Sequence, residues 1–211
     1  LLLFSCTEKM SPNRSRIHPD AEHPRFWHYN NEPVFLLGSS SDDNLFQHEH
    51  VETELDAMAA AGGNYIRCTL SSRDAGNVMP FLKTGDGRYD LDQWNPVFGQ
   101  RLQTCLQACY ERDIIVQIEL WAFHDFNQKP EDPAWNDNPW NAFNNINYDT
   151  LQTRLRRNVG HIGNAPHAFF LSVPKVNNDS LLLKYQKRFV DKVLDIALPY
   201  PNVLFCMTNE I

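Results

Sequence analysis

The sequence contains little basic charge and no long apolar run. Of its 211 residues, 19 are Lys or Arg and 26 are Asp or Glu, so the net charge is −7 with neutral histidines. Nucleic acid is recognised through concentrated Lys and Arg, and the nearest approach, Arg154, Arg156 and Arg157, is interpreted as a solvated helix face. The sequence therefore predicts no nucleic-acid partner. No apolar run reaches the length that a transmembrane helix needs.

Several motifs of catalysis and nucleotide binding are absent as well. No GxGxxG or GxxxxGK[ST] segment follows an expected strand, which removes the usual signature of a nucleotide site. No GxSxG marks a serine nucleophile, and the histidines lack the HExxH spacing of a zinc site. The sequence predicts no cofactor and no metal ligands, and nothing in it implies a protein partner.

Cysteine is scarce, with five residues in the chain. Cys68, Cys105, Cys109 and Cys206 form no CxxC pair and have no histidine neighbour at metal-ligand spacing. We expect them to be buried free thiols, because a chain of this length does not need a disulfide framework.

The first 25 residues differ from the rest. The segment LFSC at residues 3–6 continues an apolar stretch and resembles a bacterial lipobox, in which the cysteine is lipidated after signal-peptide cleavage. Residues 7–25 are polar, with little periodicity, and are typical of a tether. We expect residues 1–25 to be a signal-peptide remnant, lipobox and tether, and the protein to be exported. It would then be a cell-surface or periplasmic lipoprotein anchored through Cys6, or a secreted protein; a cut apolar stretch that happens to meet a cysteine is the alternative.

Strand and helix patterns alternate from residue 26 to residue 211. Strands are expected at residues 33–38, 64–70, 113–121 and 202–208, and helices at residues 49–61, 95–110, 148–159 and 181–198. Asn95 and Pro96 are typical of an N-cap and a first helical position. The alternation predicts an α/β fold with a parallel sheet and helical crossovers, either an open doubly wound sheet or a (β/α)8 barrel.

In either fold the chemistry is expected at the carboxyl ends of the strands. The expected strand ends carry carboxylates, amides, an arginine, a histidine and a tryptophan, namely Asp42, Asp43, Arg67, Glu119, Trp121, His124, Asp125, Asn209 and Glu210. Planar polar groups hydrogen-bond sugar hydroxyls, and aromatic rings stack on the apolar faces of pyranose rings. This combination favours a carbohydrate substrate, although turn chemistry and packing are the alternative for each residue.

The last expected strand resembles that of a known enzyme clan. The segment VLFCMTNE at residues 203–210 resembles strand four of the clan A glycoside hydrolases, which are retaining (β/α)8 barrels that include cellulases. In that clan an Asn-Glu pair ends strand four, and an arginine lies near the end of strand two, where this chain has Arg67. The resemblance covers residues 26–211. It implies a partial catalytic domain, the N-terminal half of a TIM barrel truncated after strand four.

The same resemblance implies roles for individual residues. Glu210 would be the general acid/base, and Asn209 would bind the sugar 2-hydroxyl. Arg67 would orient the nucleophile Glu, which belongs to strand seven outside this chain; an ion pair with Glu119 is the alternative. The role of His124 is open, because many clan members have a histidine at the end of strand three, where the simplest match here is Trp121.

Aromatic residues complete the candidate site. Trp121, Trp135 and Trp140 are candidate stacking platforms for sugar rings, with packing in the core as the alternative. The expected function is a retaining glycoside hydrolase that cleaves O-glycosidic bonds in a poly- or oligosaccharide, and residues 1–211 alone are expected to be inactive. Two alternatives stay open: a catalytically inactive barrel that binds carbohydrate, and a metal-dependent barrel hydrolase or isomerase.

Overall fold

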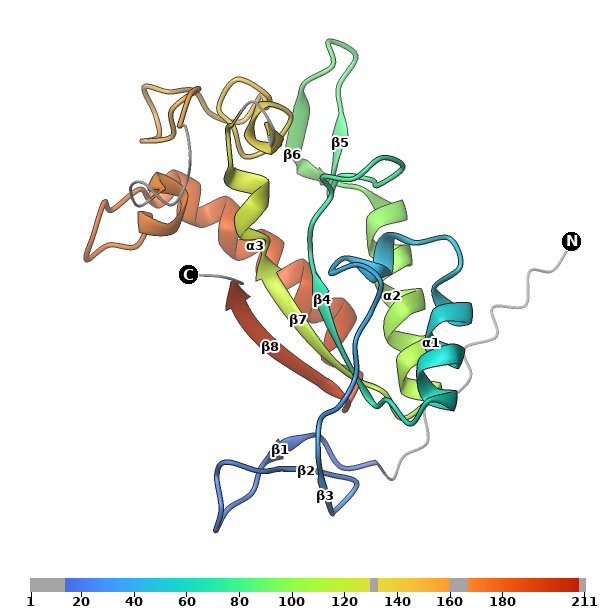
Figure 1. Ribbon diagram of the computed structural model, residues 1–211. Helices are drawn as coiled ribbons and strands as arrows, with labels where there is room; N and C mark the ends of the chain where they lie inside the picture. The colour runs from blue at the N-terminus through green and yellow to red at the C-terminus, as the bar shows by residue number, and fades with distance from the viewer. Residues whose placement is uncertain (1–13, 130–132, 160–166, 209–211) are drawn as a thin grey trace, which may run out of the picture.

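A three-stranded parallel sheet forms the centre of the molecule. The computed structural model describes residues 14–129, 133–159 and 167–208. The sheet contains β4 (Tyr65–Thr69), β7 (Ile115–Trp121) and β8 (Val203–Thr208) in the order β4-β7-β8, with every pair parallel (Figure 1). The α/β prediction is thus confirmed. Within the described residues the sheet does not close into a barrel.

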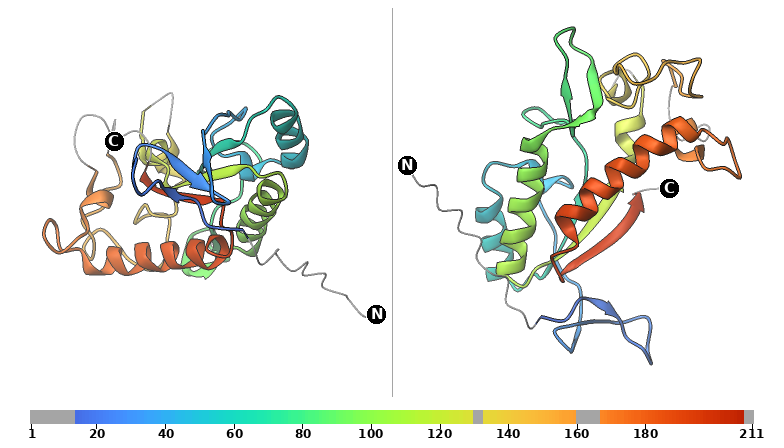
Figure 2. Two further views of the ribbon diagram at one scale, coloured as in Figure 1. Left: turned by 90° about the horizontal axis from the view of Figure 1, so that it is seen from below. Right: turned by 180° about the vertical axis from the view of Figure 1, so that it is seen from behind.

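Three helices cover one face of this sheet. They are α1 (Val51–Ala60), α2 (Pro96–Glu111) and α3 (Ser180–Ala197), and α2 packs between the other two (Figure 2). The predicted cap of α2 is confirmed, because the Asn95 side chain accepts a hydrogen bond from the amide of Val97. Asp179 caps α3 in the same way through the amide of Leu182.

Alternation along the strands separates the core from the opposite face of the sheet. In β4, Ile66 and Cys68 are buried under the helices, whereas Arg67 between them is exposed on the other side. Cys68 packs in the core with Cys105 and Cys109 of α2, and these three are buried free thiols, as predicted. Cys206 is also free, but it is only half-buried.

The predicted parallel strand at residues 33–38 is wrong. Its first residues belong to β3 (Glu32–Val34), which pairs antiparallel with β2 (Trp27–Tyr29), and β2 pairs with β1 (His18–Pro19). Residues 35–43 then run beside β4 without forming a regular ladder, although the amide of Thr69 donates to the carbonyl of Asp43. Gly38 passes so close to β4 that a Cβ there would lie 2.0 Å from the Tyr65 carbonyl oxygen.

The folded part of the chain begins earlier than the expected tether allows. Ile17 is buried, and its amide donates to the carbonyl of Pro201 at 2.8 Å. Arg14 forms an ion pair with Asp113 at 2.7 Å. Residues 14–17 are therefore packed against the amino end of the sheet, because an apolar side chain and an arginine anchor them. Cys6 and the lipobox lie outside the described residues.

The loops at the carboxyl end of the sheet carry more structure than the sequence indicates. The connection after β4 contains a hairpin of β5 (Phe81–Lys83) and β6 (Tyr89–Trp94) (Figure 1). Short 3-10 turns also occur, namely η1 (Leu45–Gln47), η2 (Phe123–Phe126), η3 (Ala134–Asn136) and η5 (Ala168–Leu171).

The helix predicted at residues 148–159 is wrong. The segment forms turns instead, and the Asp149 carboxylate accepts from the amides of Leu151 and Gln152. These are the bonds of a helix N-cap, and the amide of Thr153 also donates to the Asp149 carbonyl at 3.1 Å, so a single helical turn begins here. The amide of Arg154 is then taken by the Asp179 carboxylate.

Among the described residues, no helix combines the length and the apolarity that crossing a membrane requires.

Candidate functional site

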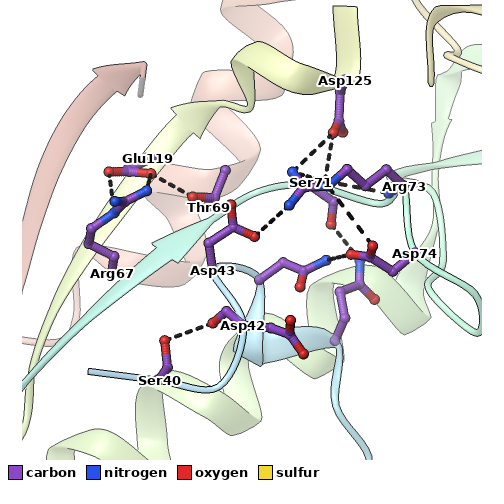
Figure 3. Close-up of polar contacts among 12 residues, drawn as sticks. Ser40, Asp42, Asp43, Arg67, Thr69, Ser71, Arg73, Asp74, Glu119 and Asp125 are labelled. Carbon is purple, nitrogen blue, oxygen red and sulfur yellow. Dashed lines mark hydrogen bonds and ion pairs between the residues drawn. The ribbon is translucent and has the colours of Figure 1, made fainter. Parts of the chain in front are cut away.

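The face of the sheet opposite the helices carries a polar network centred on Glu119 of β7. The Arg67 Nε lies 3.0 Å from one carboxylate oxygen of Glu119, and Arg67 Nη2 lies 3.3 Å from the other (Figure 3). Thr69 Oγ1 donates to Glu119 at 2.5 Å, and Gln117 Nε2 donates at 3.2 Å. Strand register explains the assembly, because Thr69 pairs with Glu119 and Arg67 pairs with Gln117.

Burial of this network is one-sided. The Glu119 side chain is 4% exposed, whereas that of Arg67 is 44% exposed. A buried carboxylate needs a partner charge and hydrogen bonds to offset its loss of hydration, and Glu119 has both. The ion pair considered as the alternative for Arg67 is thus present. It holds one edge of the guanidinium while leaving much of the side chain accessible.

A second polar cluster lies at the carboxyl ends of β4 and β7. Asp125, in η2 just after β7, accepts from Ser71 Oγ at 2.6 Å and from the amide of Ser72 at 3.2 Å (Figure 3). Arg73 Nη2 lies 2.9 Å from the Asp43 carboxylate, and its Nη1 lies 3.9 Å from that of Asp125. Parallel strands end at the same edge, which is why these loops meet.

The environment of Asp125 changes its ionisation. Burial disfavours the charged carboxylate and raises the pKa of Asp125 from 3.8 to about 6, although the bonds from Ser71 and Ser72 and the charge of Arg73 act in the opposite direction. Asp125 therefore titrates close to neutral pH. Such a shift on a strand-end carboxyl is typical of functional sites, although structural networks also produce it.

A small cavity of about 40 Å³ adjoins this cluster. Most of its wall is apolar, and Ser72, Arg73, Asp125 and Asn138 supply the polar part. The side-chain amide of Asn138 donates to the backbone carbonyl of Asp125 at 2.7 Å, which fixes the start of the loop after β7 against the cavity. Trp121 and Trp140 line the same space.

The tryptophans are packed more deeply than stacking platforms would be. Trp135 is fully buried and its Nε1 donates to the carbonyl of Arg156, so the prediction that it stacks on a sugar is wrong. Trp121 and Trp140 are 8% and 5% exposed and pack edge to face with ring centroids 5.9 Å apart. One face of Trp121 stacks on Phe189 at 5.0 Å. Trp121 and Trp140 therefore line the cavity, because other aromatic side chains cover most of both rings.

The remaining expected site residues are His124, Asn209 and Glu210. His124 lies in η2, half-buried, with its ring edge to face with Phe123 at 6.1 Å. Asn209 and Glu210 lie outside the described residues. The residue that precedes them, Thr208, ends β8 and is paired with Trp121 of β7.

Sequence reasoning missed the loop after β4. Residues 71–93 lie between an expected strand and an expected helix and have no predicted role, yet Ser71, Ser72 and Arg73 hold the carboxylates of Asp43 and Asp125. The available signal was position, because these residues directly follow a buried strand at the edge where parallel strands end.

In the described part of the chain, no group of three or more His, Cys, Asp or Glu side chains is arranged to hold a metal ion.

Comparison with known proteins finds similarity in structure only. No family model matches the chain, and no curated protein is similar to it in sequence. The structure of a "putative glycoside hydrolase" from Bacteroides vulgatus ATCC 8482 superposes with a TM-score of 0.52 and 15% identity over 93% of this chain and 32% of that chain. The fold is similar to that of a glycoside hydrolase.

A second solved structure is more distant. A β-mannanase from the blue mussel, Mytilus edulis, matches with a TM-score of 0.38 and 18% identity, over 58% of this chain and 35% of that chain. The chain thus spans about a third of the length of each of these structures. At such identities the first comparison shows a shared fold, and a shared activity does not follow from it.

Proposed function

We propose that this chain is the N-terminal half of a (β/α)8 barrel and that the whole protein is a retaining glycoside hydrolase. The observation that carries the proposal is the parallel sheet β4-β7-β8, whose strands end at one edge with a polar face opposite the helices. The fold similarity to the Bacteroides vulgatus structure supports the same architecture. In the sequence, Asn209 and Glu210 directly follow the last residue of β8.

Glycoside hydrolysis accounts for the residue types at this edge. A glycosidic oxygen leaves poorly unless it is protonated, so a carboxylic acid must stand beside it; we assign this role to Glu210. Asn209 is proposed to bind the sugar 2-hydroxyl. A retaining enzyme needs a second carboxylate about 5–5.5 Å away as the nucleophile, and we expect it from a strand that this chain does not contain.

Arg67 fits a positioning role in this proposal. Glu119 and its partners hold the Nε edge of the guanidinium, while the exposed remainder of the side chain faces away from the helices. A guanidinium placed there can donate to a second carboxylate and keep it ionised. Loss of Glu119 would free Arg67 to turn, so Glu119 supports the site through Arg67.

Substitution Glu210→Gln in the full-length gene product tests the proposal. The amide keeps the shape of the side chain but cannot donate a proton as an acid. We expect natural glycosides, which have poor leaving groups, to lose several orders of magnitude in kcat/KM. Aryl glycosides with activated leaving groups need little protonation in the first step, so they should lose far less, and added azide should restore their turnover.

An exposed glutamate provides the matched control. Glu52 lies on the solvent side of α1, and Glu52→Gln should leave the kinetics unchanged. If Glu210→Gln hydrolyses both substrate classes at the wild-type rate, Glu210 is not the acid/base. Binding of oligosaccharide without hydrolysis by the wild-type protein would instead support the inactive carbohydrate-binding barrel.

We also propose that the protein is exported and anchored through a lipidated Cys6. The support is the LFSC segment at residues 3–6 and the polar residues that follow it. In a bacterial host the protein should partition with membranes, and Cys6→Ala should release it into the soluble fraction. Cys206→Ala changes a thiol in β8 and should not alter partitioning. Unchanged partitioning of Cys6→Ala would contradict anchoring at this residue.

A further inference from the structure

Three exposed arginines lie close together in the loop that connects β7 to α3. Arg154, Arg156 and Arg157 are exposed, whereas Leu155 between the first two is buried, so Arg154 and Arg156 both face outward. The loop lies beyond the carboxyl end of β7 and is drawn in gold in Figure 1. Barrel enzymes bind their substrates at this end of the sheet. A chain with a net charge of −7 thus has a local excess of positive charge beside the candidate site.

The charge of these arginines is not neutralised within the described residues. None of the three has a carboxylate at ion-pair distance there, although six other arginines do, namely Arg14, Arg67, Arg73, Arg88, Arg112 and Arg188. The carboxylates of Asp149 and Asp179, which contact this segment, accept hydrogen bonds from backbone amides instead. The three guanidinium groups therefore retain donors for a ligand that carries negative charge.

Buried side chains hold the backbone of this segment in place. Trp135 Nε1 donates to the carbonyl of Arg156 at 3.0 Å, and Asn141 Nδ2 donates to the carbonyl of Arg157 at 3.4 Å. Asn141 Oδ1 also accepts from the amide of Phe143 at 3.2 Å, so one buried side chain ties Phe143 to the arginine segment. The guanidinium groups thus extend from a fixed backbone, which reduces the entropy that is lost when a ligand binds.

The arginines border an open cavity that also contains an exposed aromatic ring. The volume of about 880 Å³ lies within the roughly 300–1,000 Å³ that is common for ligand sites. Phe143 lines the cavity and is 48% exposed, and the guanidinium carbon of Arg157 lies 4.8 Å from the centre of its ring. The described lining residues include no Asp or Glu. The cavity therefore combines an aromatic surface for a sugar ring with guanidinium groups for an anion.

We propose that Phe143, Arg154, Arg156 and Arg157 form a subsite for an acidic sugar unit of a polysaccharide. The guanidinium groups bind a carboxylate or sulfate group of that unit, and the apolar face of its ring lies against Phe143. The inference rests on the proposed function only in taking the ligand to be a carbohydrate. It adds that the substrate is an anionic polysaccharide, which the acid/base chemistry of Glu210 does not determine. Nucleic acid is disfavoured, because the net charge of −7 repels a long polyanion outside this patch.

The test compares acidic oligosaccharides with neutral forms of the same backbone. Trigalacturonate and its methyl ester, and a sulfated galactan trisaccharide and its desulfated form, are titrated into the full-length protein by isothermal titration calorimetry. In about 50 mM NaCl we expect an acidic ligand to bind about tenfold or more tightly than its neutral partner, and in about 500 mM NaCl this ratio should fall. The pair with the larger ratio identifies carboxylate or sulfate as the preferred group.

Variants with matched charge assign the preference to this loop. Arg154→Gln combined with Arg156→Gln removes two charges, and the ratio should fall toward one, mainly through weaker binding of the acidic ligand. Arg25→Gln combined with Lys192→Gln removes two exposed charges elsewhere and should leave the ratio unchanged. Phe143→Ala should weaken the acidic and the neutral ligand, by about three- to tenfold. Circular dichroism and the melting temperature verify that each variant folds.

The outcomes separate this inference from the proposed hydrolase. Equal affinity for acidic and neutral ligands, or a ratio that the paired arginine substitutions do not change, overturns the subsite, and hydrolysis of glycosides would still support the hydrolase. Selective binding of an acidic oligosaccharide that is lost in the arginine variant, without hydrolysis of any glycoside, supports the subsite and contradicts the hydrolase. A short single-stranded DNA that binds as tightly as the acidic sugars overturns the sugar subsite in favour of a general polyanion surface. Absence of binding to all of these ligands also overturns it.

Discussion

The ionisation of Asp125 makes the stability of this fold depend on pH in a direction that can be worked out. Burial raises the pKa of Asp125 from 3.8 to about 6. In the unfolded chain the carboxyl ionises near its ordinary pKa, so between about pH 4 and pH 6 the folded protein retains a proton that the unfolded chain has released. The stabilising contribution of this proton is complete below about pH 4 and is lost as the pH rises through 6.

Asp125→Asn removes this dependence because an amide does not ionise. A rise in pKa from 3.8 to about 6 corresponds to about 3 kcal/mol between the charged and neutral forms. The side chain is 16% exposed, and the remaining solvent contact lowers this figure to about 2 kcal/mol. The free energy of unfolding of the variant, minus that of the wild type, should therefore increase by about 2 kcal/mol between pH 4 and pH 7.5.

Urea unfolding of the full-length protein, followed by tryptophan fluorescence across this pH range, measures that difference. Asp86→Asn is the control. Its carboxyl is exposed and its pKa is lowered to about 2 by hydrogen bonds from Thr84 and Arg88, so above about pH 5 it is ionised in both states and its difference should be flat from pH 5 to pH 7.5. A difference for Asp125→Asn that varies by less than about 0.5 kcal/mol would show that Asp125 ionises normally and that the cluster is well hydrated.

Two further predictions concern the local geometry that supports the site. Gly38→Ala should destabilise the fold by about 1–3 kcal/mol in urea unfolding, because the new Cβ would lie 2.0 Å from the Tyr65 carbonyl oxygen. Gly85→Ala, where a Cβ meets open space, should be nearly neutral, and equal effects of the two substitutions would contradict the close approach. Asn95→Ala should cost about 1 kcal/mol through loss of the α2 cap, whereas Asn95→Ser, which retains a capping oxygen, should cost less.

Local patterns in the sequence were sufficient for most of the regular elements. α2 and α3 follow from apolar residues at helical spacing, and α2 also from Asn95, whose side chain accepts a hydrogen bond at the helix start. β7 is a nearly continuous apolar run, which is what a strand buried on both faces requires. These features depend on neighbours within a few residues, so they can be read without the fold.

Patterns failed where a distant partner determines the local conformation. The helix expected at residues 148–159 stops after one turn, because the Asp179 carboxylate takes the backbone amide of Arg154 that would continue it. The strand expected at residues 33–38 is apolar, yet its first residues pair with β2 instead. In both places a competing hydrogen bond outweighs a weak local preference.

The candidate site shows the same division. The order of strands and helices and the polar residues at strand ends can be obtained from the sequence alone, because the carboxyl ends of parallel strands meet at one edge. The tertiary structure decided which of these residues interact. Strand register pairs Thr69 with Glu119, and the meeting of the loops brings Arg73 between Asp43 and Asp125. Burial likewise made Trp135 a core residue, since aromatic rings satisfy a packing role and a binding role equally well in a sequence. Desolvation and long-range pairing are properties of the assembled chain, and they determine the ionisation of Asp125 and the cavity beside it.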